Sequence, residues 1–255
     1  MNPWGVDSGY IDVTVRDNVG VVTFQRENKL NALTASMRKE LAAILRHYGS
    51  GDSVRGIVIT GSGRAFSAGQ DMSEAAEGPD GLISAVELFH DVTRAALQTK
   101  IPVVAAVNGL AVGGACEMTL SFDARLGTRQ AEYFLPENNL GLAISNAASI
   151  LLRRLVGNKA MGLVLESTRI DAQSAFSLGL LDHMVEPGEL VDASIALVQR
   201  WTQPGAATVA HLQLLRPSLS AIEAAIQRET TAARYLQDNG IAQDGIQRFL
   251  TRNNG

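Results

Sequence analysis

Short apolar stretches with an alternating or continuous pattern mark the strands in the first half of the chain. Ile11–Val15 and Val19–Phe24 lie on either side of Arg16-Asp17-Asn18, which indicates two paired strands joined by a turn. The continuous apolar runs Gly56–Thr60 and Val103–Val107 are typical of strands that are buried on both faces. We therefore expect a sheet with a buried centre.

Helical periodicity separates these strands. Thr34 is suited to cap a helix whose apolar residues recur every three or four positions from Met37 to Tyr48. A second helical segment is expected around 82–98, after a glycine-containing loop at 74–81. The β–α–β alternation predicts an α/β fold.

The pattern changes after about residue 145. Strand signals nearly vanish apart from His183–Glu186, and helical stretches follow one another near 146–156, 159–167, 172–179, 188–203, 219–238 and 241–252. The C-terminal third is therefore expected to be mostly helical. Its apolar face has to be buried somewhere, and another subunit is one place for it.

The composition argues against several functional classes. The chain has 255 residues, 46% hydrophobic content and a formal net charge of −4. No basic field favours nucleic acid, and no apolar run reaches the roughly 18 residues of a membrane span. The single cysteine and the spacing of four histidines argue against a metal site. A cytoplasmic protein without a signal peptide is the expectation.

Two short stretches have the composition of active-site turns. Ala65–Asp71 and Pro102–Glu117 each contain an apolar strand followed by a turn of small residues. Such turns can leave backbone N–H groups without partners, and two N–H groups aimed at one point form an oxyanion hole. Two carboxylates, Glu117 and Glu137, follow the second turn. Donors beside two acids suit proton transfer next to a carbonyl.

These stretches resemble, in order, those of the crotonase family, also called the enoyl-CoA hydratase/isomerase superfamily. The matching segments are Arg26–Leu33, Gly56–Gly61, Ala65–Asp71, Ile101–Gly109, Gly113–Glu117, Phe134–Glu137, Ala175–Leu181 with Val185, and Asp244–Arg252. The likeness spans nearly the whole chain. It implies a spiral of ββα units at 1–195, followed by a helical oligomerisation region at 196–255.

The resemblance also implies a site. Backbone N–H groups of Gln70 and Gly114 would stabilise a thioester enolate, and Glu117 and Glu137 would hold water and move its proton. Coenzyme A, as part of the substrate, would contact the chain around five positions; no other cofactor and no metal are expected. These positions are Lys29, Leu30, Ala68, Asp71 and Met72. The expected partner is a second copy, in a homotrimer or a dimer of trimers.

Each of these residues also has a structural interpretation. Glu117 could be an acid near a helix start, where the macrodipole favours it, and Glu137 could be an exposed or capping acid. Asp71 fits a cap or turn better than an acid catalyst. Lys29 and Arg26 could be solvated surface charges, whereas Cys116 is best interpreted as a packed thiol. His90 and His183 are most simply structural.

One segment departs from the hydratase pattern. Where glycines are expected after the second glutamate, the chain has Ser145-Asn146-Ala147-Ala148-Ser149. The added side chains would project near the acyl pocket, which predicts a preference for longer, branched or functionalised acyl groups. Ser145 also stands where the dienoyl-CoA isomerase branch has an aspartate.

Three functions are compatible with the sequence. The leading hypothesis is an enoyl-CoA hydratase that adds water across the 2,3 double bond of a trans-2-enoyl-CoA in fatty acid metabolism. An isomerase of the same family needs only one acid. An acyl-CoA-binding or RNA-binding homologue with little catalysis is the third, although the acidic pI weighs against RNA.

Overall fold

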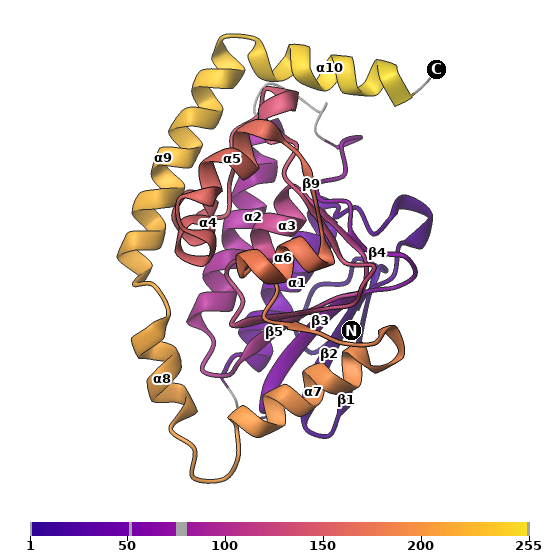
Figure 1. The fold of residues 1–255 in the computed structure, drawn as a ribbon, viewed down its shortest axis with the longest axis vertical. Helices are drawn as coiled ribbons and strands as arrows, with labels where there is room; N and C mark the ends of the chain where they lie inside the picture. The colour runs from indigo at the N-terminus through magenta and orange to yellow at the C-terminus, as the bar shows by residue number, and fades with distance from the viewer. Residues whose placement is uncertain (1, 51–52, 75–80, 254–255) are drawn as a thin grey trace.

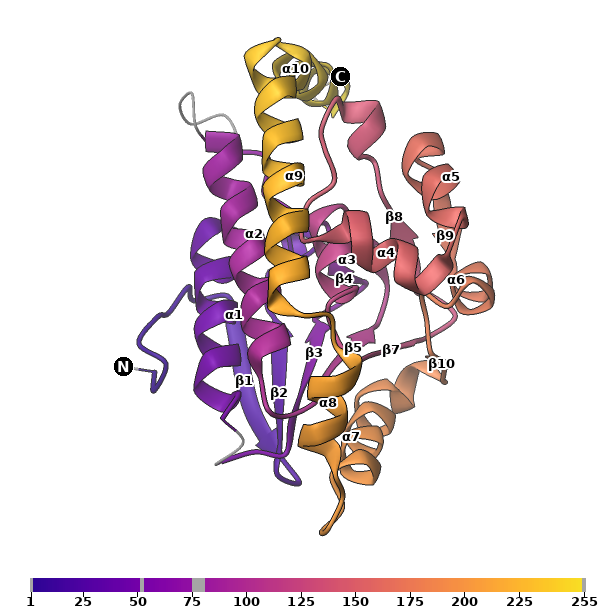
Figure 2. The same cartoon turned by 90° about the vertical axis from the view of Figure 1, so that its left-hand side faces the viewer.

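Two β-sheets meet in the interior of the molecule, and helices cover them (Figures 1 and 2). The computed structural model describes residues 2–50, 53–74 and 81–253. In these residues one sheet has the strand order β1-β2-β3-β5-β7-β10 and the other β4-β6-β8-β9. The strands are β1 (Ile11–Arg16), β2 (Val19–Phe24), β3 (Gly56–Gly61), β4 (Ala65–Ser67), β5 (Val103–Val107), β6 (Leu110–Val112), β7 (Ala124–Gly127), β8 (Glu132–Phe134), β9 (Arg169–Asp171) and β10 (His183–Met184).

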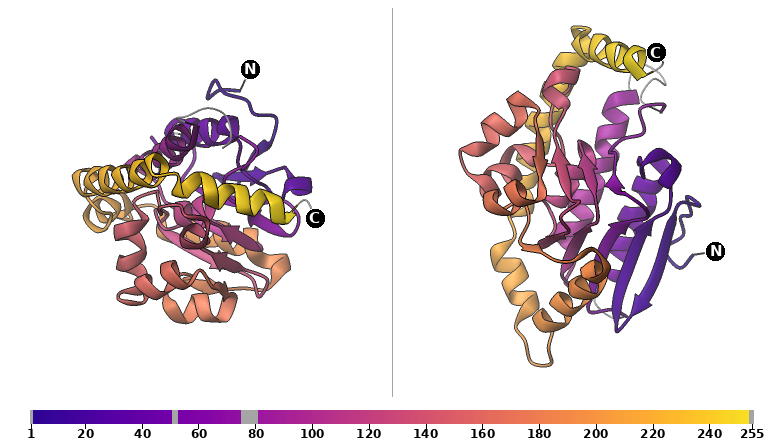
Figure 3. Two further views of the ribbon diagram at one scale, coloured as in Figure 1. Left: turned by 90° about the horizontal axis from the view of Figure 1, so that it is seen from above. Right: turned by 45° about the vertical axis from the view of Figure 1, so that its right-hand side comes forward.

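The C-terminal part of the chain is mostly helical, as the sequence predicts. In Figure 1, α8 and α9 run along one side of the molecule and α10 crosses one end; Figure 3 shows α10 from above. The helices are α1 (Ala35–Tyr48), α2 (Gly81–Gln98), α3 (Gly114–Thr119), α4 (Ala148–Val156), α5 (Lys159–Glu166), α6 (Ala172–Leu178), α7 (Leu190–Trp201), α8 (Thr208–Leu215), α9 (Leu219–Asp238) and α10 (Ile241–Asn253). Short 3-10 helices occupy Glu27–Lys29, Glu137–Leu140 and Pro187–Glu189.

From β3 to β8, successive strands of the chain alternate between the two sheets. β1 and β2 pair antiparallel across a turn in which Asp17 and Asn18 have φ values of 52° and 61°, a conformation that Asp and Asn tolerate. After β3, β5 and β7, the chain enters the other sheet as β4, β6 and β8, which are parallel neighbours. The carboxyl ends of these three strands therefore lie along one edge of the smaller sheet.

The central strands of the larger sheet, β2, β3, β5 and β7, are buried on both faces, whereas the edge strands β1 and β10 are largely exposed. Side chains along the central strands alternate between a layer that includes α1 and α2 and a layer that includes α7. Ile57 and Ile59 face the first layer, whereas Val58 packs in the second with Leu197 and Val198 of α7. This double burial fixes the sheet as a rigid support for the loops at its edge.

Most predicted elements are confirmed, but α8 and the short strands β6, β7, β8 and β9 were not predicted. Thr34 caps α1 by accepting a hydrogen bond from Met37 N at 3.2 Å. The apolar residues of α8 show little helical periodicity, so no local pattern indicates this helix. β9 is a three-residue strand that exists through antiparallel pairing with β8. Of the predicted loop at 74–81, residues 75–80 lie outside the described residues, and Gly81 begins α2.

The apolar face of α9 is buried within its own chain. Ile222, Ala225 and Ile226 are buried in the main core, and α9 packs against α2 and α4 (Figure 2). The helix α9 therefore does not require another subunit to bury its apolar face. In α8, by contrast, Leu214 and Leu215 are 77% and 72% exposed. The division at 195/196 stays a prediction. Among the described residues, no helix is long and apolar enough to cross a membrane.

Candidate active site

Three predicted site residues follow the carboxyl ends of the parallel strands β4, β6 and β8. Gln70 comes three residues after β4, Gly114 comes two residues after β6, and Glu137 comes three residues after β8. Because the ends of parallel strands share one edge, these residues meet although they are far apart in sequence. Glu117 joins them as the fourth residue of α3.

The backbone N–H groups of Gln70 and Gly114 have no acceptor among the described residues. Leu33 pairs with Gln70 in a parallel bridge, in which Leu33 N donates to Gly69 O and Asp71 N donates to Leu33 O. The N–H of Gln70 therefore points away from this pairing. Gly114 begins α3, and the first N–H groups of a helix have no intrahelical acceptor.

Glycine is required where these two turns touch. Gly69 has a φ of +84°, and a Cβ placed on it would lie 2.5 Å from Val112 O and 3.7 Å from Gly114 N. The backbones before the two donors are thus in direct contact. Gly113 has a φ of +52° and a ψ of −126°, a conformation that is essentially restricted to glycine.

Glu117 is a buried acid with three hydrogen-bond donors. Its Oε1 accepts from Ser145 N at 2.9 Å. Its Oε2 accepts from Ser145 Oγ at 2.6 Å and from Asn146 Nδ2 at 3.1 Å. Burial raises the pKa of Glu117, and the bonds from Ser145 and Asn146 oppose that rise. The donors therefore favour the ionised form.

Glu137 is buried in different surroundings. Its Oε2 has no hydrogen-bond partner among the described residues. Burial, and next the charge of Glu117, raise the pKa of Glu137 well above its usual range. Two nearby acids with different surroundings take different protonation states, which leaves one proton donor and one proton acceptor.

Both glutamates and both backbone donors line one cavity of about 300 Å³. Its other walls are mostly apolar. They come partly from residues that the sequence did not indicate: Phe89 of α2, Ala233 and Leu236 of α9, and Ala242 of α10. These residues lie far from the motifs along the chain, and only the packing of the helices brings them to the site. No Lys, Arg or His lines the cavity in the part of the chain that the structure describes.

The five positions expected to meet coenzyme A are brought together only in part. Ala68 and Met72 line the cavity, and Ala68 N donates to Leu30 O at 2.8 Å, so that Leu30 lies at its rim. Lys29 is exposed beside Leu30. The side chain of Asp71 accepts from Arg26 at 2.6 Å and from Ser73, which agrees with its interpretation as a turn residue.

The family model described as "Enoyl-CoA hydratase/isomerase" matches residues 14–254 of the chain. The chain belongs to this family, the crotonases.

Its relatives carry names of more than one activity. The chain is 34% identical to the short-chain-enoyl-CoA hydratase of Clostridium acetobutylicum over 69% of each chain. It is 32% identical to the 1,2-epoxyphenylacetyl-CoA isomerase of Escherichia coli over 74% of this chain and 75% of that protein. A solved enoyl-CoA hydratase from Mycobacterium avium subsp. paratuberculosis matches with a TM-score of 0.83 and 28% identity, over 95% of this chain and 96% of that chain.

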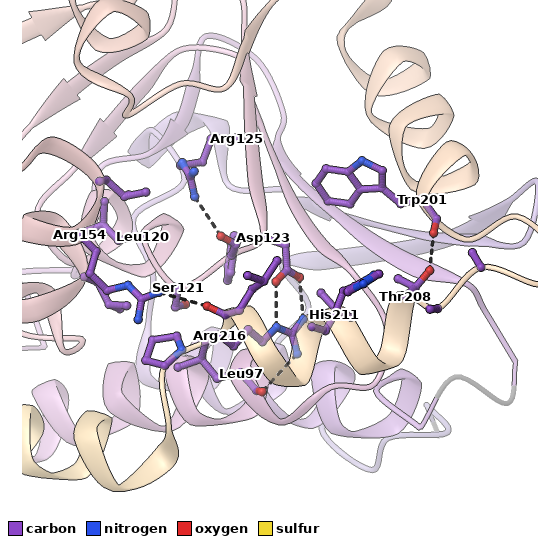
Figure 4. Close-up of a pocket in the computed structure, with 18 residues that line it drawn as sticks. Leu97, Leu120, Ser121, Asp123, Arg125, Arg154, Trp201, Thr208, His211 and Arg216 are labelled. Carbon is purple, nitrogen blue, oxygen red and sulfur yellow. Dashed lines mark hydrogen bonds and ion pairs between the residues drawn. The ribbon is translucent and has the colours of Figure 1, made fainter.

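This crotonase has a second, larger cavity of about 760 Å³ beneath α8 (Figure 4). Most of its charged groups are already engaged. Arg216 pairs with Asp123 at 2.6 Å (Figure 4), and Arg125 pairs with Asp182 at 2.7 Å. Arg154 donates to Leu215 O at 3.1 Å. Neither glutamate of the candidate site lines it. The smaller cavity, with two acids and two open N–H groups, is therefore the better candidate for chemistry.

The cysteine and the two histidines considered in the sequence analysis have surroundings that agree with structural roles. Cys116 is buried, and burial raises the pKa of its thiol well above the usual value, which agrees with a packed thiol. His90 is fully buried on α2 beside Glu87 and Glu229. His183 is exposed at the start of β10. Among the described residues, no group of three or more His, Cys, Asp or Glu is arranged to hold a metal ion.

Proposed function

We propose that this protein is an enoyl-CoA hydratase, which adds water across the 2,3 double bond of a trans-2-enoyl-CoA. One observation carries the proposal: Glu117 and Glu137 share a cavity with the open N–H groups of Gln70 and Gly114. The thioester oxygen accepts hydrogen bonds from the two N–H groups, which stabilise the negative charge that develops on it.

The unequal surroundings of the two acids support different roles for them. Glu117, whose donors favour its ionised form, takes a proton from water as the water oxygen bonds to C3. Glu137, held neutral by burial, gives its proton to C2. The product has gained one water molecule. The pair is reset when Glu117 loses its proton and Glu137 regains one.

Coenzyme A is proposed to approach along the edge formed by Leu30, Ala68 and Met72. The support is that Ala68 and Met72 line the cavity that holds the two acids. The exposed ammonium group of Lys29 is suited to a phosphate of the nucleotide. Asp71 contributes through its backbone, because its carboxylate is engaged by Arg26.

A double-bond isomerase is the second candidate. It is favoured by the three donors on Glu117, which leave Glu137 as the acid with an unpartnered oxygen at the cavity. One acid that abstracts and returns a proton suffices for a shift of the double bond. The relatives include proteins named for each activity.

One absorbance assay separates these functions. Hydration of crotonyl-CoA and of longer 2-enoyl-CoAs removes the absorbance of the conjugated thioester, whereas isomerisation of a 3-enoyl-CoA creates it. The proposal expects the loss. A gain from 3-enoyl-CoA without hydration would establish the isomerase, and binding of CoA esters without any change would indicate a binding protein.

A homotrimer or a dimer of trimers is also proposed. The support is α8, an apolar helix without a buried residue, on which Leu214 and Leu215 are exposed. Large exposed apolar patches mark interaction surfaces. Sedimentation velocity tests the proposal: a mass of three or six chains is expected, and Leu214→Glu combined with Leu215→Glu should lower it.

A further inference from the structure

Among the described residues, the hydrogen-bond donors to the carboxylate of Glu117 all come from Ser145 and Asn146. The backbone N–H of Ser145 and the amide of Asn146 can only donate, to Oε1 at 2.9 Å and to Oε2 at 3.1 Å. The Ser145 hydroxyl lies 2.6 Å from Oε2, within the range of hydroxyl–carboxylate hydrogen bonds. The carboxylate is thus held from two directions.

The turn that carries these donors is itself held in place. Asn146 and Ala147 are buried and have φ values of 62° and 57°, which side-chain-bearing residues rarely adopt. Glu229 of α9 accepts from Ala147 N and Ser149 N, both at 2.8 Å. A carboxylate from a distant helix therefore caps α4, whose own N-cap residue is an alanine.

The orientation of the Asn146 amide is fixed from the opposite side. Thr93 Oγ1 of α2 lies 3.1 Å from Asn146 Oδ1, and Asn146 Nδ2 faces both Glu117 Oε2 and Gly114 O. A flipped amide would place Oδ1 against the carboxylate of Glu117. The amide therefore presents its donor to Glu117.

The donors matter because no positively charged side chain lies near the carboxylate of Glu117 among the described residues. The titratable groups around Glu117 are Glu137, Glu229 and Cys116, none of which supplies a positive charge in its ordinary states. The cavity lining has no Lys, Arg or His among the described residues. The hydrogen bonds from Ser145 and Asn146 therefore offset the burial of a negative charge on Glu117.

We propose that Ser145 and Asn146 are positioning residues that keep Glu117 ionised and aimed at the water that it deprotonates. The proposal rests on the proposed function of Glu117 as the base in hydration. It gives a role to the segment in which this chain departs from the glycine-containing hydratase pattern: the hydroxyl of Ser145 supplies a donor that a glycine lacks.

The test compares the pH dependence of kcat for hydration in the wild type and in Ser145→Ala. The variant keeps the backbone N–H and loses only the hydroxyl. Hydrogen bonds to charged groups are worth enough to move the acidic limb of the profile up by about one to two pH units. Ser145→Thr retains a hydroxyl and should restore the limb.

Two further variants make the comparison specific. Ser149→Ala removes a hydroxyl of the same segment that makes no hydrogen bond to Glu117, so its profile should match the wild type. Asn146→Gly tolerates the left-handed backbone and removes the amide donor, so its limb should also move upward. An acidic limb that is unchanged in both Ser145→Ala and Asn146→Gly would overturn the proposal.

A second readout separates this proposal from the proposed function. Infrared titration of the buried carboxyl, assigned by its loss in Glu117→Gln, should show a higher midpoint in Ser145→Ala. Such a shift in a protein without hydratase activity would support the role of the donors and refute the hydratase. Hydration with an unshifted midpoint would support the hydratase and refute the role of the donors.

Discussion

Glu137 and Gly113 are in direct contact at the cavity: a Cβ on Gly113 would lie 2.8 Å from Glu137 Oε1. The glycine therefore serves two purposes, because its backbone conformation turns the chain into α3 and its missing side chain leaves room for the acid. Gly113 N also donates to Phe134 O at 2.8 Å, which ties this turn to the strand before Glu137.

Replacement of Gly113 by alanine should displace Glu137. We expect kcat to fall about 10²-fold, the usual effect of a misplacement near 1 Å. Gly157→Ala is the matched control, because Gly157 has nearly the same φ and ψ, 59° and −134°, and nothing within 4 Å of its Cβ position. Both variants should lose stability, measured by Tm. Equal kcat values in the two variants would show that contact with Glu137 is unimportant.

Both acids should be needed for hydration. Glu117→Gln and Glu137→Gln should each lower kcat by roughly 10²–10⁴, the usual share of a positioned acid or base. The Kd for a CoA ester should change little. Glu132→Gln is the control, since Glu132 pairs with Arg169 at the surface. If only Glu137→Gln lowers activity, the isomerase becomes the better proposal; near-full hydratase activity in either variant contradicts the two-acid mechanism.

The N–H of Gly114 should contribute to catalysis, apart from any effect of adding a side chain at this position. Gly114→Pro removes the N–H and should raise the barrier by about 3 kcal/mol, as loss of one oxyanion donor does. Gly114→Ala is the control, because a Cβ there also lies 2.7 Å from the Phe89 ring but the N–H remains. Gln70→Ala should be mild. Similar kcat values for Gly114→Pro and Gly114→Ala, with similar Tm and oligomer size, would rule out this donor.

Glu229 should make the free energy of unfolding depend on pH. Burial raises the pKa of Glu229 from 4.5 to about 7, so the folded protein binds a proton that the unfolded chain releases in between. Its stabilising contribution is complete below pH 4.5 and is lost as the pH rises through about 7. At 1.36 kcal/mol per pH unit, the loss is on the order of 3 kcal/mol.

Denaturant unfolding of Glu229→Gln and the wild type from pH 4.5 to 8 measures this contribution. The neutral amide avoids ionisation, so the variant should gain stability relative to the wild type as the pH rises. Glu223→Gln, on the same helix, is the control: hydrogen bonding to Arg94 lowers the pKa of Glu223, so its effect changes only at lower pH. A difference between wild type and Glu229→Gln that does not vary with pH would be incompatible with this prediction.

The acyl preference remains a prediction from the segment 145–149. Ser145 adds a polar side chain to the cavity wall, and Leu236 and Ala242 extend the wall into the C-terminal helices. We expect kcat/KM to peak at acyl groups that are longer than C4, branched or functionalised. A series from C4 to C16 with branched and aryl enoyl-CoAs measures it. A clear maximum at crotonyl-CoA would contradict the prediction.

Local sequence patterns were enough to predict the α/β class, most strands of the larger sheet and the two turns that bear Gln70 and Gly114. These features follow from local physics: apolar runs bury strands, Thr34 caps a helix, and small residues form tight turns. The acids Glu117 and Glu137 could be named from their order in the chain. The difference between the surroundings of the two acids could not be predicted from the sequence.

The surroundings of the two acids depend on contacts between distant segments of the chain. The donors from Ser145 and Asn146 reach Glu117 across 28 and 29 residues, and Glu229 reaches Ala147 across 82. No periodicity encodes such contacts, because they join segments that only the fold brings together: α4 and the turn before it pack against α3 and α9. The same holds for α8 and β9, since one lacks a helical pattern and the other exists only through its pairing with β8. Local patterns therefore set the elements, while long-range packing set the electrostatics of the site.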